Sequence, residues 1–283
     1  MRNFKILFIA LLLPFVATSQ DYLNVMSFNI RLSLPQDSLN NWPYRKDKVT
    51  SQILFHEAHI VGVQEALPGQ MNDLKEGLKN YKPIGVSREG GYEKGEFSAI
   101  FIDTTRLQVL QSATFWLSEN PSAVGVKGWD AQQPRIVTWA KVKDKKTRKN
   151  FYCFNTHFDH MGKIARKESA KLLQQKVAEI AGKSPTIITG DFNATPDDEP
   201  IQVLTEMKNP NRFIDARHVS QTPHYGQNWT FNGFRIAPTS GTLIDYVFIK
   251  NNVTVLQHAY LTQTWDSRFS SDHFPVFGRV KIN

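Results

Sequence analysis

Hydrophobic and polar positions along this 283-residue chain fall into two kinds of segment. Short runs rich in β-branched and aromatic residues predict strands, and longer stretches with an apolar residue every three or four positions predict helices. The expected strands span residues 22–30, 60–64, 99–103, 108–117, 135–142, 151–156, 186–189, 243–249, 253–260 and 275–282. The expected helices span residues 44–58, 70–78, 163–181 and 200–207. The two kinds interleave and several strand pairs resemble hairpins, which predicts an α/β sandwich with mixed sheets.

Polar side chains repeatedly occur where these apolar strands end. The segments are Ser27-Phe28-Asn29, Gln64-Glu65, Thr156-His157, Gly190-Asp191-Phe192-Asn193 and Ser271-Asp272-His273. Each of them alone has an ordinary structural explanation, such as a turn, a solvated loop or a satisfied core histidine. Asp245 lies inside an apolar strand and is harder to explain in this way, because an unpaired buried carboxylate is costly. Since clefts in α/β folds form at strand ends, the whole set predicts one convergent site.

The residue types in this set are those of a hard-metal site accompanied by two imidazoles. Asparagine and carboxylate oxygens without thiolates suit Mg²⁺, with Mn²⁺ or Ca²⁺ as alternatives, better than they suit zinc. The single cysteine, Cys153, excludes a disulfide framework and cysteine-rich metal sites. Histidines near neutrality donate to phosphate oxygens or exchange protons. Together these groups suit the attack of water on phosphorus.

The order of these motifs resembles the endonuclease/exonuclease/phosphatase superfamily, which includes deoxyribonuclease I, exonuclease III, neutral sphingomyelinases and inositol polyphosphate 5-phosphatases. The resemblance covers residues 27–276, and its most specific parts are Gly190-Asp191-Phe192-Asn193 and Ser271-Asp272-His273-Phe274-Pro275-Val276. It implies a four-layer α/β sandwich with two central mixed β-sheets and metal-dependent hydrolysis of phosphate esters. The segment 156–162 is most similar to the secreted bacterial branch of the superfamily.

The resemblance also implies which residues hold the metal. Glu65 would be the main metal carboxylate, Asn29 would contribute directly or through water, and Asp272 would complete the metal side. The expected ion is Mg²⁺, and it would offset charge on the phosphoryl oxygens and on the leaving oxygen. Charges and dipoles that are held in position in this way usually supply the largest share of an enzyme's rate enhancement.

The remaining core residues are implied to act on water and phosphate. Asp191 would position and deprotonate the attacking water, and Asn193 would orient this water or the phosphate. His273, held by Asp245, would contact the phosphate. His157 would contact another non-bridging oxygen or help the leaving group.

Two arginines are candidates for contact with the substrate phosphate. Arg135 either reaches the phosphate or is a surface arginine of a strand. Arg166 begins the helix expected over residues 163–181, where an anion would also meet the helix N-terminus. The alternative for Arg166 is a place on the solvated face of that helix.

Three further residues are candidates for the substrate side of the cleft. Glu96 is expected to pair with His157, as a glutamate does in deoxyribonuclease I. Trp229 and the nearby Phe231 either line the substrate rim or plug the core, because aromatic side chains in loops do both.

The chain begins with two cations, an apolar run and the pair Ala17 and Ser19, a layout typical of a secretory signal peptide cleaved after Ser19. Residues 1–19 are therefore expected to be a signal peptide, and residues 20–283 are expected to form one catalytic domain. The apolar run is shorter than the roughly 20 residues of a transmembrane helix. A periplasmic or secreted bacterial protein is expected, since a protein with one thiol relies on its core alone for stability.

The formal net charge of +8 favours anionic partners. Removing Arg2 and Lys5 with the signal peptide leaves +6, and the basic run 141–149 predicts a solvated hairpin turn rather than a nucleic-acid groove. The leading hypothesis is a secreted phosphoesterase acting on a small-molecule, sugar-linked or lipid-linked phosphate. The alternatives are an extracellular nuclease acting on DNA or RNA and an inactive binding protein on the same fold. No protein partner is indicated.

Overall fold

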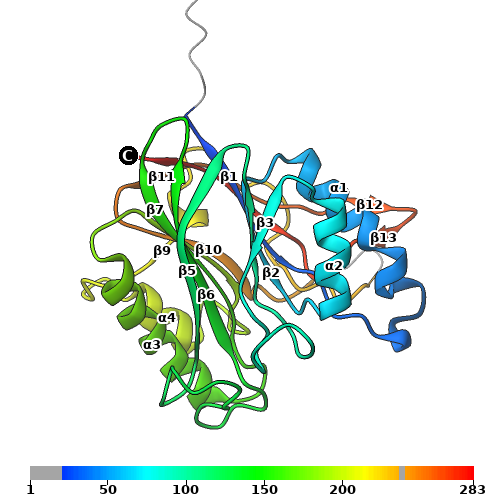
Figure 1. Cartoon of the computed structure of the whole chain (residues 1–283), viewed down its shortest axis with the longest axis horizontal. Coiled ribbons are helices and arrows are strands. Elements are labelled where there is room, and N and C mark those ends of the chain that lie inside the picture. Colours follow the sequence, from blue (N-terminus) through cyan, green and yellow to red (C-terminus); the bar gives the residue numbers. More distant parts are fainter. Residues whose placement is uncertain (1–20, 236–239) are drawn as a thin grey trace, which may run out of the picture.

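The computed structural model describes residues 21–235 and 240–283, in which two six-stranded β-sheets pack face to face between two layers of helices (Figure 1). Sheet I contains, in spatial order, β11 (Val253–Tyr260), β14 (Val276–Ile282), β1 (Leu23–Asn29), β2 (Ile60–Gln64), β4 (Ile100–Asp103) and β3 (Tyr81–Ile84). Sheet II contains β5 (Leu107–Trp116), β6 (Ile136–Asp144), β7 (Asn150–His157), β8 (Thr186–Asp191), β10 (Asp245–Lys250) and β9 (Ile214–Asp215). The expected four-layer sandwich with mixed sheets is confirmed. The expected signal peptide, residues 1–19, lies outside the described residues.

The helices form the two outer layers of the sandwich. On sheet I lie α1 (Lys46–Phe55) and α2 (Pro68–Gly77), and on sheet II lie α3 (Lys163–Ala181) and α4 (Glu199–Thr205) (Figure 1). Short 3-10 turns span Pro35–Asn40, Trp42–Tyr44 and Ala216–Val219, and a small hairpin joins β12 (Thr264–Trp265) to β13 (Arg268–Phe269). No helix in the described part of the chain is both long enough and apolar enough to span a bilayer.

Strand β1 shows why its sequence forms a central strand. All seven of its residues are buried, and successive side chains point to opposite faces of the sheet. Leu23 and Val25 join the core shared with sheet II. Met26 and Phe28 join a second core that includes Val49 of α1. A strand covered on both faces can be apolar at every position, which is why β1 lacks the alternation of a half-exposed strand.

The directions of the strands place the polar motif residues at one end of the sandwich. The β1–β2 and β7–β8 pairs are parallel, whereas the other strand pairs of the described residues are antiparallel. The registers place Asn29 beside Gln64 in sheet I and His157 beside Asp191 in sheet II. The carboxyl ends of four central strands therefore carry the polar residues of the sequence motifs.

A buried polar layer joins the sheets one pleat below these strand ends. Ser27, Asn155 and Thr189 each lie two residues before a motif residue, so they point to the same face as that residue. Gln64 donates to Asn155 Oδ1 (2.7 Å) and to Ser27 Oγ (3.3 Å), and Thr189 Oγ1 donates to the same Asn155 oxygen (2.9 Å). A Cβ at Gly62 would collide with Thr189 and Asn155. This layer fixes the separation of the two sheets beneath the motif residues.

Candidate active site

Three neighbouring strands of sheet II end in a row of acid and imidazole side chains. His157 of β7 is in register with Asp191 of β8, and Asp191 is in register with Asp245 of β10. Directly paired residues of adjacent strands present their side chains on the same face. All three residues are buried. The register alone therefore collects side chains that are far apart in the sequence.

Sheet I supplies the opposite side of the site. Asn29 ends β1, Glu65 follows β2, and Asp272 and His273 precede β14. Asn29 donates its amide to Glu65 Oε1 (3.0 Å) and to Asp191 Oδ2 (2.9 Å), while Asn29 Oδ1 accepts the Arg31 N–H (3.0 Å). In this arrangement Asn29 links two carboxylates as a hydrogen-bond donor, and its oxygen is engaged by the backbone.

Four non-glycine residues of the cleft lining have a left-handed backbone. The φ angles are 57° for Arg31, 64° for Glu65, 46° for Asn193 and 57° for Phe234. Such conformations cost free energy, least for asparagine, and persist only where the surroundings hold them. The Glu65 conformation ends β2, and the Glu65 side chain lines the cleft. Two of these four residues, Glu65 and Asn193, are residues that the sequence motifs marked.

Asp191, like Asp245, is an almost fully buried carboxylate of the site. Burial, and then the charge of Asp245, raise the pKa of Asp191 to about 7. Its Oδ1 accepts the Asn193 N–H (2.9 Å), and its Oδ2 lies 3.5 Å from His157 Nε2. A carboxylate with a pKa near neutrality, oriented by fixed donors, is suited to accept a proton from water.

His273 and Asp245 form a buried pair. His273 Nδ1 lies 2.8 Å from Asp245 Oδ2, and the other Asp245 oxygen is buried without a partner among the described residues. Burial alone would lower the pKa of His273, but Asp245, followed by Asp272 and Asp191, raises it well above the ordinary value. The protonated ring presents a cationic Nε2–H donor to an anionic ligand.

His157 has the opposite character. Burial, followed by the charges of Arg135, His273, Arg88 and His160, lowers the pKa of His157 well below its ordinary value. The Asn193 amide donates to His157 Nε2 (3.0 Å), which fixes the neutral ring with its proton on Nδ1. One imidazole of the site is therefore charged and the other is neutral.

These groups open into a cleft of about 700 Å³. One part of its wall is acidic and includes Glu65, Asp191 and Asp272. The part around His157 is cationic, with Arg88 and Arg135, and His160 Nδ1 accepts from Arg135 Nη2 (3.0 Å). The remaining lining residues are Arg31, Leu32, Asp37, Glu96, Gln133, Asn193, Phe231, Gly233, Phe234, Ile244 and His273. An anion placed between the two parts would meet donors on one side and carboxylates on the other.

The donor set fits a divalent cation. Ligand atoms of Glu65, Asp191 and His273 all lie within 4.8 Å of one another. Burial raises the pKa of Asp272 as well as that of Asp191, which means that these carboxylates lack full compensation of their charge. His273 is engaged by Asp245 through Nδ1, so the carboxylate oxygens are the better ligands. An oxygen-rich site of this kind suits Mg²⁺, Mn²⁺ or Ca²⁺.

The substrate-side predictions have mixed outcomes. Arg135 lines the cleft as predicted for a phosphate contact. The predicted Glu96–His157 pair is wrong, because Glu96 pairs with Arg88 (2.9 Å) and His157 is held by Asn193. The backbone explains this, since the Arg88 N–H donates to the Glu96 carbonyl (2.8 Å) and keeps the two residues together.

Arg166 and Trp229 lie away from the cleft lining. Arg166 Nη1 donates to the Asp159 carbonyl (2.9 Å) and therefore braces the segment after β7. Trp229 is partly buried against the core, as its second interpretation predicted. Phe231, two residues later, lines the cleft, and its ring meets the His273 ring edge-on at 5.0 Å.

The sequence interpretation missed several residues of the cleft. Arg31 lies 3.0 Å from Asp37 and 3.7 Å from Asp272, and its place two residues after Asn29 was the available signal. Arg88 lies in an irregular loop without any periodic signal. Arg45 is fully buried and donates Nη1 to the carbonyls of Ile30 (2.7 Å) and Ser270 (2.8 Å). It thereby ties the end of β1 to the segment that carries Asp272 and His273.

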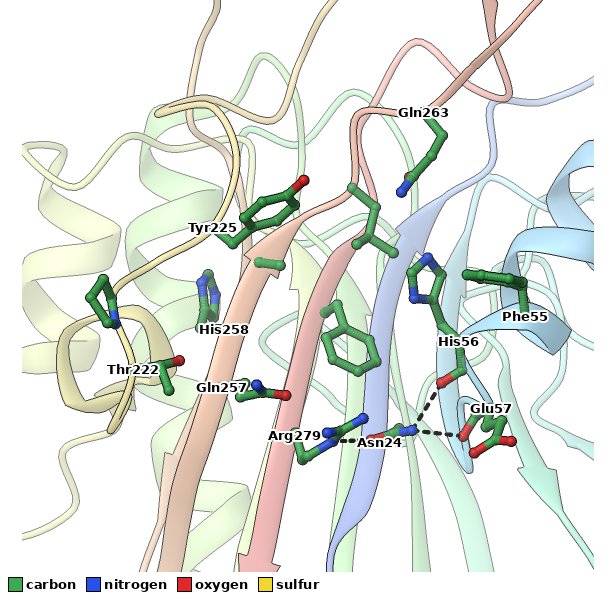
Figure 2. Close-up of a pocket in the computed structure, with 14 residues that line it drawn as sticks. Asn24, Phe55, His56, Glu57, Thr222, Tyr225, Gln257, His258, Gln263 and Arg279 are labelled. Carbon is green, nitrogen blue, oxygen red and sulfur yellow. Dashed lines mark hydrogen bonds between the residues drawn. The ribbon is translucent and has the colours of Figure 1, made fainter.

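A second hollow lies on the outer face of sheet I, over β11, β14 and β1 (Figure 2). The exposed side chains of Phe55 and Tyr225 stand on its opposite walls. Asn24 Nδ2 donates to the carbonyls of His56 (2.9 Å) and Glu57 (3.3 Å), which attaches the end of α1 to β1. Glu57 is the one carboxylate among the described residues that line this hollow. The acidic and imidazole residues of the motifs line the other cleft.

Asp159 holds the Arg135 part of the wall. Its carboxylate accepts from the Met161 and Gly162 N–H groups (3.0 and 2.8 Å) and from Arg135 Nε (3.3 Å). Burial alone would raise the pKa of Asp159, but backbone donors, led by the Gly162 N–H, and the charge of Arg135 hold it at about 2. An unfolded aspartate has a pKa of about 3.9, so ionisation of Asp159 stabilises the fold above that pH.

Asp159→Asn is expected to lower the free energy of unfolding by about 1–3 kcal/mol at pH 7 and to raise KM, because Arg135 loses its anchor. The stability difference from wild type should shrink as the pH falls from about 4 towards about 2, where the native carboxyl becomes protonated. Denaturant unfolding at pH 7 and at low pH measures this. A difference that stays constant across this range would show that the Asp159 charge does not stabilise the fold.

The sequence and the fold both match known proteins. Residues 26–273 match the endonuclease/exonuclease/phosphatase family. An endonuclease/exonuclease/phosphatase from Bacteroides vulgatus is 41% identical, with a TM-score of 0.89, and the match covers 93% of this chain and 100% of that one. The mannosyl-6-phosphatase of Bacteroides thetaiotaomicron VPI-5482 is 36% identical, with a TM-score of 0.86, over 91% of this chain and 99% of that one.

A viral protein is a more distant relative. Protein R895 of Acanthamoeba polyphaga mimivirus is 22% identical over 282 residues, which cover 87% of this chain. The chain spans 41% of the length of that protein, so the viral relative contains further sequence. The two bacterial structures, by contrast, are matched over nearly their whole length.

Proposed function

Because the chain belongs to the endonuclease/exonuclease/phosphatase family, we propose that it is a divalent-metal-dependent phosphatase of small phosphate monoesters, with sugar phosphates as the first class to test. The observation that carries the proposal is the cleft of about 700 Å³, which Arg135 lines together with the carboxylates of Glu65, Asp191 and Asp272. A terminal phosphate carries two charges at neutral pH, and arginine recognises such oxygens with paired donors. A bounded cleft also suits a small molecule better than a polymer.

In the proposed reaction, a water molecule attacks phosphorus and the bond to the leaving alcohol breaks. Asp191 accepts the proton of the water, and the Asn193 N–H and the Asn29 amide hold the Asp191 carboxylate in place. His273, kept protonated by Asp245, donates to a phosphoryl oxygen. The neutral His157 lies beside Asp191 and contacts another oxygen of the same phosphate. The leaving oxygen takes up a proton from solvent, so the products are inorganic phosphate and the free alcohol.

Glu65 and Asp272, whose charges act on each other, would hold the divalent cation that the family generally uses, next to Asp191. When bound, the cation offsets charge on the phosphoryl and leaving oxygens. Asn29 keeps the Glu65 and Asp191 carboxylates together before any cation arrives, since it donates to both. The chain's own contribution is therefore a preformed pair of carboxylates whose charge is only partly compensated.

The similarity to a mannosyl-6-phosphatase supports a sugar phosphate as the substrate. The nuclease alternative draws on the positive net charge of +8. The basic run 141–149, however, covers the end of β6 and the hairpin turn from β6 to β7. His157 lies at the other end of β7 from this turn, roughly 20 Å away at about 3.3 Å per residue. These cations therefore do not extend the cleft into a nucleic-acid groove.

A substrate panel separates the two activities. Purified protein with Mg²⁺ receives mannose 6-phosphate, phenyl phosphate, plasmid DNA and a single-stranded oligonucleotide. We expect phosphate release from the monoesters and intact plasmid. Cleavage of the nucleic acids without phosphate release from either monoester would contradict the proposal and favour the nuclease. The absence of any turnover, with Mg²⁺ bound, would favour the binding-protein alternative.

We further propose that the enzyme is exported to the periplasm or the medium of a bacterium. The cations, apolar run and cleavage-site residues within 1–19 support export. N-terminal sequencing of the protein recovered outside the cytoplasm should find Gln20 as the first residue. Recovery of the protein only from the cytoplasm, with its first residues intact, would contradict export.

A further inference from the structure

The wall of the cleft contains a buried ion pair that the hydrolysis of a phosphate does not require. Arg88 Nη1 lies 2.9 Å from Glu96 Oε2, and the two side chains are 14% and 15% exposed. Both residues line the cleft. Buried ion pairs add little net stability, because the cost of desolvation offsets the attraction. Glu96 would also repel a phosphate, so binding of the phosphate does not explain a carboxylate at this position.

The backbone fixes this pair close to the metal-binding side of the cleft. The Arg88 N–H donates to the Glu96 carbonyl (2.8 Å), and the Phe97 N–H donates to the carbonyl of Ala66, the residue after Glu65 (2.8 Å). Trp116 Nε1 donates to the Arg88 carbonyl (2.7 Å). The two charged groups are therefore held at a constant position relative to Glu65.

The Arg88 guanidinium has unused donor capacity. Its Nε is buried and has no hydrogen-bond partner among the described residues. A buried donor without a partner is costly, and an oxygen of a bound ligand would remove this cost. Beside it, Glu96 offers an acceptor. The wall thus presents a donor and an acceptor side by side, near Arg135.

We propose that the Arg88–Glu96 pair binds hydroxyl groups of the leaving alcohol, which makes the substrate a phosphorylated sugar or another phosphorylated polyol. This inference rests on the proposed phosphatase function. A hydroxyl group both donates and accepts, so neighbouring hydroxyls of a sugar satisfy Glu96 and Arg88 together. An apolar leaving group satisfies neither, and its binding would leave both polar groups desolvated. Sites built to hydrogen-bond a hydroxyl discriminate strongly against analogues that lack it.

The test compares two leaving groups in two variants. We measure kcat/KM for mannose 6-phosphate and for phenyl phosphate with wild type and with Glu96→Gln. The wild type should prefer the sugar phosphate, and Glu96→Gln should reduce the ratio of the two kcat/KM values by about tenfold or more, mainly through KM for the sugar. Arg88→Lys, which keeps the charge but lacks Nε, should reduce the same ratio.

A matched control lies on the same loop. Glu89 is exposed and pairs with Lys94 outside the cleft (3.4 Å), so Glu89→Gln should leave the ratio as in wild type. Equal losses for both substrates in Glu96→Gln would show that the pair only supports the loop and would overturn the inference. An unchanged ratio would overturn it as well. Phosphate release from phenyl phosphate by wild type reports the phosphatase function separately, and its absence would refute that function first.

Discussion

Asp191→Asn is expected to lower kcat for phosphate monoesters by about 1,000-fold or more, which lies within the usual contribution of a general base. The substitution keeps the shape of the side chain but removes the carboxylate whose pKa is raised to about 7 by burial and by Asp245. An amide at position 191 can accept with one oxygen only. It therefore cannot satisfy the Asn193 N–H and the Asn29 amide together and also take a proton from water.

The measurement is kcat with phenyl phosphate at saturating Mg²⁺, accompanied by a thermal unfolding curve. Asp197→Asn is the matched control, because Asp197 is an exposed acid a few residues along the same loop. The control should retain wild-type activity, and both variants should unfold cooperatively. If Asp191→Asn kept more than about a tenth of the wild-type kcat, Asp191 would not be the base, since even weak general bases contribute about 100-fold.

Removal of divalent cations is expected to reduce activity by about 100-fold or more, with recovery on addition of Mg²⁺. The reason lies in the carboxylates of the cleft, because burial disfavours the ionised forms of Asp191 and Asp272, which a cation would stabilise. Without a cation these carboxylates repel the phosphate. Glu65→Gln removes one charge from the same group and should raise the Mg²⁺ concentration needed for half-maximal activity by about tenfold or more.

Activity measured against free Mg²⁺ in wild type and in Glu65→Gln tests this directly. Glu76→Gln, at an exposed position of α2, is the control and should show the wild-type dependence. Activity that chelation leaves unchanged would remove the cation from the mechanism. A normal Mg²⁺ requirement in Glu65→Gln would instead place the cation on other residues of the cleft.

The central strands and the core of the site could be predicted because local pattern and tertiary environment agree there. Helix α3 has the predicted bounds, and the strand expected over residues 253–260 is β11. The motif residues gather because regular registers place strand ends side by side, as for His157, Asp191 and Asp245. Sequence alone indicates strand ends. Their pairing, which is parallel between β7 and β8 and antiparallel between β8 and β10, brings the side chains to one edge.

Short edge elements were not predictable in the same way. Strand β3 contains a lysine and a proline, which weaken the signal for a strand, and its stability comes from pairing with β4. Strands β9, β12 and β13 contain two residues each, too few for any periodicity. Helix α1 begins later than predicted, because Trp42–Tyr44 forms a separate 3-10 turn.

The substrate side of the cleft depends on loops, whose conformation the sequence pattern does not encode. Glu96 was expected beside His157, but pairing of Phe97 with Ala66 and Ser87 places this loop against the residue after Glu65. Arg88 lies in the same loop, and no pattern in the sequence indicated a role for it. The role of Arg45 could not be predicted for a different reason. The sequence does not distinguish a buried arginine that donates to carbonyl groups from an arginine at the surface. Tertiary contacts, and not propensity, decide all three positions.

The central claim is that this cleft catalyses attack of water on the phosphorus of a monoester. Hydrolysis of mannose 6-phosphate in ¹⁸O-labelled water, followed by mass spectrometry of both products, tests it most directly. The account predicts inorganic phosphate that carries one ¹⁸O atom per turnover and a sugar that carries none from the cleavage step. Label found at the carbon–oxygen bond of the sugar, or no release of phosphate with Mg²⁺ present, would contradict it.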